Sequence, residues 1–240
     1  MHDLAVALSE RLVTSLPPER RQPELREIVA FGLEIGLGTL WELAVILAVA
    51  AWLGFLPEVA LAVLAAGSFR LCAGGGHCTA YYRCLLSSIV TFNFLAWLAA
   101  FLAARSGTVF ALGAWLSTAA VCFYAVYRWA PADTPRAPIS ASSRPRLRRL
   151  SFFCLAFWLA LTLKFYFTGS GGSLFWAAIL ALLLQGYTIS PSGYRFIAGL
   201  DKLLKFLLPL EKINGRRQKN VEEAHALHHD PGRHPGRGGR

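Results

Sequence analysis

Long apolar runs constrain this chain more than any other feature of its sequence. A mostly apolar run of roughly 18 or more residues is long enough to cross the hydrocarbon core of a bilayer as a helix, and a soluble domain does not need one. Several such runs follow one another here. We therefore predict an all-α membrane protein with about six transmembrane helices. The predicted spans are residues 28–56, 58–73, 84–104, 108–127, 150–168 and 173–190.

The regions outside the spans divide the chain further. In residues 1–27 leucines recur at intervals of four, which predicts an N-terminal amphipathic helix at the membrane interface. The transmembrane domain, residues 28–190, includes a basic, proline-rich loop at 128–149. An apolar stripe in residues 191–210 predicts a second interfacial helix. Residues 211–240 have too little apolar surface to offset the entropy of ordering, so we expect a mobile basic tail.

The charge of the chain indicates which partner it meets. There are 24 Lys and Arg against 14 Asp and Glu, a net charge of +10. The basic residues lie between and after the apolar runs, which favours anionic membrane lipids over nucleic acid. The first 27 residues lack the apolar core of a cleavable signal. The five cysteines lack the spacing of an extracellular disulfide framework, so we predict that they are reduced.

Lysine and arginine also predict the orientation. Of the 24 basic residues, only Arg105 and Lys164 fall on one side of the predicted spans. The positive-inside rule assigns the richly basic side to the cytoplasm. We therefore expect a multi-pass protein of the cell membrane with both termini, the proline-rich loop and the glycine-rich segment before the third span facing the cytoplasm.

Reactive side chains concentrate between Arg70 and Cys84. A cysteine nucleophile acts as its thiolate, and a nearby imidazole such as that of His77 can accept the proton and return it to a leaving amine. On one straight helix these two positions would lie about 10 Å apart along the axis, too far for direct proton transfer. The backbone must therefore bend between them, and the three glycines that precede His77 permit a bend.

The start of the third span would favour a Cys84 thiolate through the helix dipole, with Arg70 or Arg83 adding positive charge. The first-turn N–H groups are also candidate oxyanion donors. Simpler interpretations stand beside this one. Cys84 could be a small packing residue, and the two arginines could anchor the chain at the membrane interface.

Zinc is a competing interpretation of the same segment. Structural zinc ligands usually come as two close pairs separated by a longer loop, whereas these cysteines recur every six residues. We therefore predict no metal and no cofactor. The four possible ligands are Cys72, His77, Cys78 and Cys84.

Two carboxylates lie within the first predicted span. Glu34 and Glu42 are eight residues apart and share nearby faces of a helix. Carboxylates at such depth usually turn toward a partner or a cavity. They could hold the basic end of a substrate helix, or they could pair with Arg70 or with an interfacial arginine.

At this point the sequence resembles the accessory gene regulator B family, the membrane cysteine endopeptidases of peptide quorum sensing. The resemblance covers most of the chain, and two separate motifs at compatible topological positions make it specific. The similar segments are 70–84, 130–135 with Pro138-Ile139, 31–34 and 188–201.

The resemblance implies that His77 and Cys84 are the catalytic pair and that Arg70, Gly75 and Gly76 belong to the same motif. It also implies cleavage of a short amphipathic signalling propeptide through an acyl-enzyme thioester, followed by cyclisation. A membrane-surface site with limited water would favour attack from within the peptide over hydrolysis.

The basic loop leaves one role open. Asp133 could orient His77 as a third catalytic member or cap the local backbone, and Ala137 stands where the family often has a basic residue. Our hypothesis is a membrane-embedded cysteine endopeptidase. The alternatives are a peptide exporter or channel without proteolytic chemistry and a non-catalytic scaffold. A homodimer is also possible.

Overall fold

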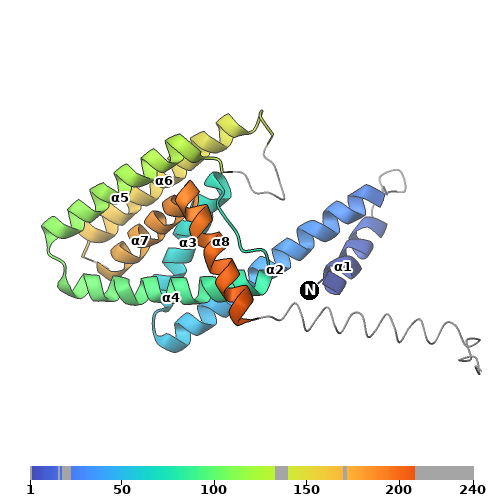
Figure 1. Cartoon of the computed structure of the whole chain (residues 1–240), viewed down its shortest axis with the longest axis horizontal. Helices are drawn as coiled ribbons and strands as arrows, with labels where there is room; N and C mark the ends of the chain where they lie inside the picture. The colour runs from blue at the N-terminus through green and yellow to red at the C-terminus, as the bar shows by residue number, and fades with distance from the viewer. Residues whose placement is uncertain (1, 16, 18–22, 133–139, 170–171, 209–240) are drawn as a thin grey trace, which may run out of the picture.

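The structure is a computed structural model that describes residues 2–15, 17, 23–132, 140–169 and 172–208. The described chain is all-α, as the sequence predicted, and contains no β-strand (Figure 1). The helices are α1 (His2–Thr14), α2 (Pro23–Leu53), α3 (Leu56–Ala73), α4 (Tyr81–Arg105), α5 (Thr108–Trp129), α6 (Arg144–Phe167), α7 (Gly172–Thr188) and α8 (Pro191–Leu207).

Membrane-spanning length and hydropathy are found in five of these helices, α2 to α6. The count becomes six if α7 and α8, which meet at an angle of 92°, are taken together as one broken span. Hydropathy therefore predicted the multi-pass character and five of the spans, while the sixth predicted span, 173–190, corresponds to α7, which counts as a candidate only together with α8.

Helix α7 lies at the centre of the bundle, between α3, α4, α5 and α6 (Figure 1). Small residues let its neighbours approach closely, as is usual between membrane helices. Ala177, Ala178 and Ala181 are fully buried. At Gly186 a Cβ would come within 2.8 Å of the Cys122 sulfur, so the approach of α5 requires glycine there.

Several helix ends differ from those expected. The first span begins at Pro23 rather than residue 28, and α4 begins at Tyr81 rather than residue 84. The largest difference is at α6, which starts at Arg144 although residues 128–149 were predicted to be loop. Its arginines mimic a solvated loop, but Pro145 in the first turn is compatible with a helix start because its missing N–H is not needed there.

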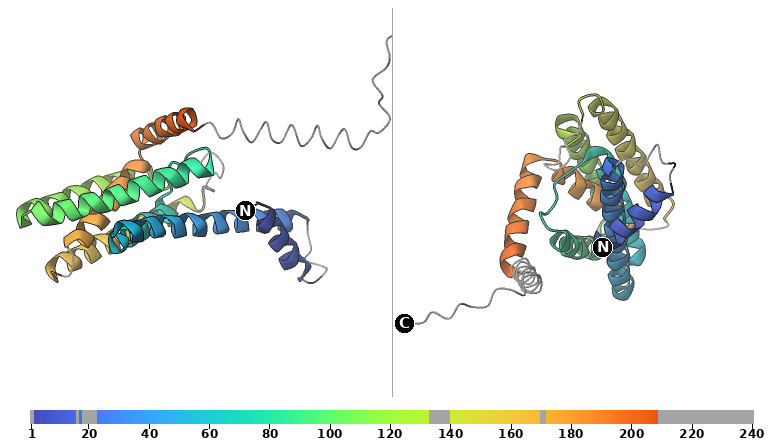
Figure 2. Two further views of the ribbon diagram at one scale, coloured as in Figure 1. Left: turned by 90° about the horizontal axis from the view of Figure 1, so that it is seen from below. Right: turned by 90° about the vertical axis from the view of Figure 1, so that its right-hand side faces the viewer.

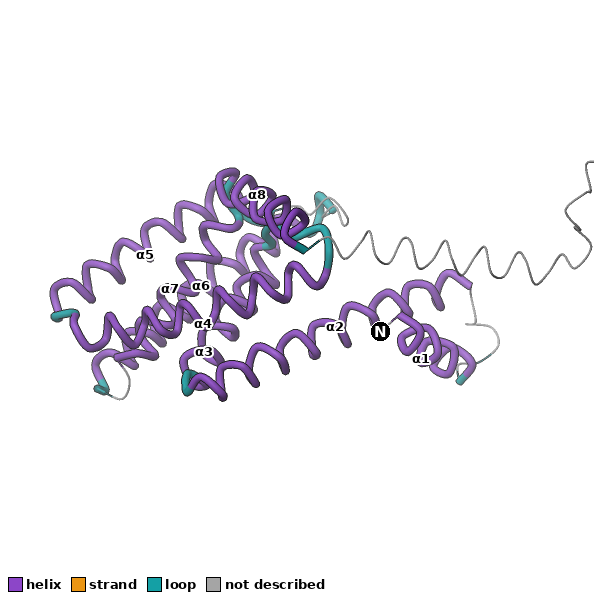
Figure 3. The backbone as a smooth tube through the Cα atoms, turned by 60° about the horizontal axis from the view of Figure 1, so that its bottom comes forward, coloured by secondary structure: helices purple, strands orange, loops and turns teal. Residues whose placement is uncertain are grey.

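Helix α1 is present where an N-terminal amphipathic helix was predicted, and it packs against α2 at some distance from the bundle (Figure 3). The opposite half of α2 joins the bundle. There Ile46 and Ala50 form a small buried cluster with Val59 of α3 and Ala96 of α4.

Helix α8 lies outside the bundle, on one side of it (Figure 2). Phe196, Leu203 and Phe206 are exposed on it, as are Lys202 and Lys205. The sequence predicted an amphipathic helix here, and the structure contains one. Its position at a membrane interface stays a prediction.

Candidate functional site

The helical pattern breaks between α3 and α4, where residues 74–80 form no helix. Gly74 ends α3 with φ +75°, and Gly75 follows with φ +142°, conformations that side chains disfavour. Gly74 also pairs with Ala132 in an isolated bridge, and the Ala132 N–H donates to the carbonyl of Ala73 at 2.8 Å. A Cβ at Gly74 would collide with the Ala132 carbonyl oxygen. The glycines therefore permit both the bend and the close approach of the 130–132 segment.

Arg70 and Gln185 bind the first half of this break, the glycines 74–76. One Arg70 Nη donates to the carbonyl of Gly76, and the other donates to Gln185 Oε1 at 3.4 Å. The Gln185 amide in turn donates to the carbonyl of Gly74 at 2.8 Å. A Cβ on Gly75 would lie 3.1–3.4 Å from atoms of Thr188, Gln185 and Arg70. The glycine segment is thus fixed between α3 and α7.

The bend returns the chain to Cys84. This residue lies in the first turn of α4, where its N–H donates to the carbonyl of Ala80 at 3.2 Å, and it is half-buried. The backbone of Cys78 lies close to the Cys84 thiol. Because His77 directly precedes Cys78, the segment that carries the histidine folds back against the cysteine. His77 itself is exposed. A straight helix does not connect the two residues, as the sequence required.

Charged and phenolic groups surround Cys84. The Arg70 guanidinium interacts electrostatically with Cys84, Glu42 and Tyr194. Glu42 also interacts with Cys84 and with Tyr81, and the Tyr81 hydroxyl donates to the carbonyl of Gly38 on α2 at 2.5 Å. Arg70 and Glu42 thus interact electrostatically without an ion pair between them among the described residues, and the role of Glu42 stays a prediction.

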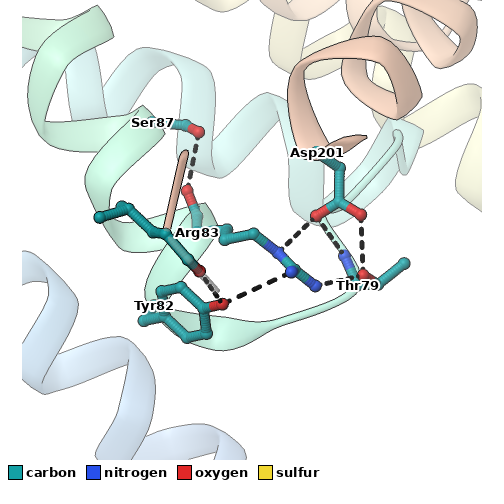
Figure 4. Close-up of polar contacts among 6 residues, drawn as sticks. Thr79, Tyr82, Arg83, Ser87 and Asp201 are labelled. Atoms are coloured by element: carbon teal, nitrogen blue, oxygen red, sulfur yellow. Dashed lines mark hydrogen bonds and ion pairs between the residues drawn. The ribbon is translucent and has the colours of Figure 1, made fainter. Parts of the chain in front are cut away.

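A second polar cluster holds the other half of the break (Figure 4). Asp201 of α8 accepts from the Thr79 N–H at 3.1 Å and from the Thr79 hydroxyl at 2.7 Å. The same carboxylate pairs with Arg83 Nε at 2.9 Å. An Nη of Arg83 donates to the Thr79 hydroxyl at 2.6 Å. Three residues from two helices and the connecting segment thus form one closed network.

The comparisons with known proteins bear on this arrangement. A sequence model of the accessory gene regulator B family matches residues 7–189, from α1 to the end of α7. This chain belongs to the accessory gene regulator B family. Membership of the family gives it a role in the agr quorum-sensing system, in which the family is associated with processing of the agr propeptide. No curated protein and no solved structure matches the chain significantly.

Cys78 lies between the two halves of the break. Burial raises the pKa of its thiol, and a hydrogen bond from Ser87 works in the opposite direction. The Asp201 carboxylate raises that pKa further, while Arg83 lowers it. A thiol in these surroundings therefore needs a base to ionise near neutral pH.

The remaining residues that the sequence singled out do not all lie near Cys84. Glu34 is exposed on α2, two turns before Glu42. Asp133, Ala137 and the rest of the family-like segment after residue 132 lie outside the described residues. All five cysteines are free thiols. Among the described residues, no group of three or more His, Cys, Asp and Glu side chains is arranged to hold a metal ion.

Sequence reasoning did not identify Gln185, Thr79 or Asp201. Gln185 carried a usable signal, since a polar side chain within an apolar helix usually faces a partner in the protein. Asp201 carried a weaker one as the acidic residue of a helix with several basic residues. Neither signal names a partner, because the bonded residues are more than 100 positions away.

Proposed function

We propose that this member of the accessory gene regulator B family is a membrane-embedded cysteine endopeptidase. It cleaves a short amphipathic signalling propeptide with Cys84 as the nucleophile and His77 as the general base. The observation that carries the proposal is the glycine-dependent bend, which brings the backbone next to His77 onto the Cys84 thiol beside Arg70. Family membership supports a propeptide as the substrate.

The first half-reaction forms a thioester. His77 accepts the proton of the Cys84 thiol, and the sulfur attacks the carbonyl carbon of the scissile peptide bond. The resulting oxyanion is stabilised by backbone N–H groups at the start of α4 and by the positive charge of Arg70. The C–N bond then breaks as the His77 imidazolium gives its proton to the leaving amine. The N-terminal part of the propeptide stays bound to Cys84.

The second half-reaction releases the product by cyclisation. A nucleophilic side chain of the bound peptide attacks the thioester carbonyl, loses its proton to His77, and displaces the Cys84 thiolate. The imidazolium then reprotonates the thiolate, which restores the starting state. At a membrane surface with limited water, this internal attack competes well with hydrolysis.

The membrane arrangement of the proposal follows the distribution of basic residues. The break between α3 and α4 and helix α8 face the cytoplasm, where the propeptide is made. Exposed apolar residues of α8, with Lys202 and Lys205 beside them, contact an anionic lipid surface. The substrate is then presented from the membrane surface.

Propeptide cleavage by the Cys84→Ala variant tests this function. Membranes that contain wild-type or variant protein are incubated with amphipathic propeptides of the agr type, and products and protein adducts are identified by mass spectrometry. The wild type forms an acyl adduct on Cys84, and Cys84→Ala and His77→Ala abolish cleavage. Cys72→Ser is a matched control on α3 that keeps activity. Normal cleavage by Cys84→Ala would exclude the proposal, and peptide transport that persists in this variant without cleavage would favour an exporter.

A further inference from the structure

Asp201 is placed unlike the other charged residues of α8. Its side chain is turned into the protein and the residue is 7% exposed, whereas Lys202 and Lys205 are exposed. Its partner Arg83 is 0% exposed. Two charges removed from water in this way rarely stabilise a fold more than well-packed apolar residues would. A gain in stability is therefore a poor explanation for this buried pair.

The contacts of the carboxylate point to another role. Asp201 binds the backbone and the hydroxyl of Thr79, which is two residues after His77. It also pairs with Arg83, the residue directly before Cys84. One rigid carboxylate thus joins the segment of the histidine to the helix of the cysteine, and the bond from Arg83 to the Thr79 hydroxyl closes the ring.

We propose that Asp201 is a positioning residue, which sets the placement of His77 relative to Cys84 through Thr79 and Arg83. This inference rests on the proposed function for the assignment of those two reactive residues. Helix α8 thus contacts the site from outside the bundle through Asp201 (Figure 2). Asp201 lies after residue 189, where the match to the family model ends.

The reactivity of Cys84 provides a test that needs no substrate. In membranes, wild type and Asp201→Asn are alkylated with iodoacetamide from pH 6 to pH 9, values that bracket roughly the ordinary His and Cys pKa, and each cysteine is quantified by mass spectrometry. We expect Asp201→Asn to slow alkylation of Cys84 at neutral pH several-fold without changing that of Cys154. Lys202→Gln, which removes one charge from the neighbouring position of α8, behaves as wild type. An unchanged pH profile in Asp201→Asn would overturn the proposal.

Cleavage kinetics provide the second measurement. A misplaced catalytic pair loses turnover, so kcat for an agr-type propeptide falls about 10²-fold in Asp201→Asn while KM changes little. Thr79→Val, which removes the bridging hydroxyl, also lowers kcat with little change in KM. Thr79→Ser keeps the hydroxyl and restores activity. If Thr79→Ser is as slow as Thr79→Val, the hydroxyl does not position the site and the proposal fails.

A double variant separates positioning from folding. Asp201→Asn leaves the Arg83 charge buried without a carboxylate, whereas Arg83→Met with Asp201→Asn removes both charges and restores the balance. We expect the double variant to regain the wild-type Tm and to keep the low kcat. Recovery of kcat together with Tm would show a purely structural pair and overturn the inference. Failure of the proposed function is distinguishable, because Cys84→Ala would then cleave normally whatever Asp201 does.

Discussion

The two halves of the break between α3 and α4 are held by different kinds of contact. In the first half, Arg70 donates to the neutral oxygens of Gly76 and Gln185. In the second half, Arg83 pairs with the carboxylate of Asp201. Both arginines lie beside the same short segment, but only the second is matched by a carboxylate at ion-pair distance among the described residues.

Because their partners differ in charge, the two arginines have different roles. Because the hydrogen bonds of Arg70 go to neutral groups, its positive charge can act on Cys84, with which it interacts electrostatically. The charge of Arg83 is balanced by Asp201, so its contribution is the geometry of the Thr79 network. Arg70 combines electrostatic and structural roles, whereas Arg83 is structural.

Removal of the Arg70 charge is the strongest way to test this comparison. Arg70→Gln should lower kcat/KM for propeptide cleavage by about 10²–10³-fold, the usual cost of losing one group that stabilises an oxyanion. Arg70→Lys keeps the charge but has one nitrogen in place of the two Nη groups, so its kcat/KM should lie between those of the wild type and Arg70→Gln. Steady-state cleavage assays with matched membrane content measure the series. Equal losses in Arg70→Lys and Arg70→Gln would show that the charge does not matter.

Gly75→Ala perturbs the first half of the break between α3 and α4 without changing any charge. The residue has φ +142°, and a Cβ would lie 3.1 Å from Thr188 Oγ1 and 3.3 Å from Gln185 Nε2. Strain of this kind costs about 1–3 kcal/mol, so we expect a lower thermal midpoint and a loss of cleavage of roughly 10–10²-fold. Gly113→Ala on α5 is the control, since nothing lies within 4 Å of its Cβ position. A Gly75→Ala variant with wild-type activity would contradict the importance of this bend.

Gln185→Leu removes the neutral bridge between α7 and the break. It leaves the Gly74 carbonyl and one Arg70 Nη without their α7 partner, at a cost of about 1–3 kcal/mol in the free energy of unfolding. Cleavage should fall about tenfold, because Arg70 keeps its charge and its bond to Gly76. Ser117→Ala, which loses a hydrogen bond within α5, serves as the control. A loss as large as that of Arg70→Gln would show that α7, not the charge, dominates.

The sequence predicted some of these features and missed others for physical reasons. Membrane spans could be predicted because hydropathy and length act locally along the chain. The bend before Cys84 could also be predicted, since glycine permits conformations that other residues disfavour. The partners of Arg70 and Arg83 could not, because they depend on how α7 and α8 pack against α3 and α4. The same local reasoning misplaced the start of α6, where arginines suggested a loop.

The smallest expected effect is at the edge of the site, where Tyr81 connects α4 to α2. Tyr81→Phe removes the hydrogen bond to the Gly38 carbonyl, which costs about 0.5–1.5 kcal/mol in the free energy of unfolding. This bond does not touch either half of the break, so cleavage should change by less than about threefold. Tyr127→Phe, which removes an exposed hydroxyl of α5, is the control. If Tyr81→Phe instead lost as much activity as Gln185→Leu, α2 and its Glu42 would have to be counted as a third support of Cys84. The two-part comparison would then be incomplete.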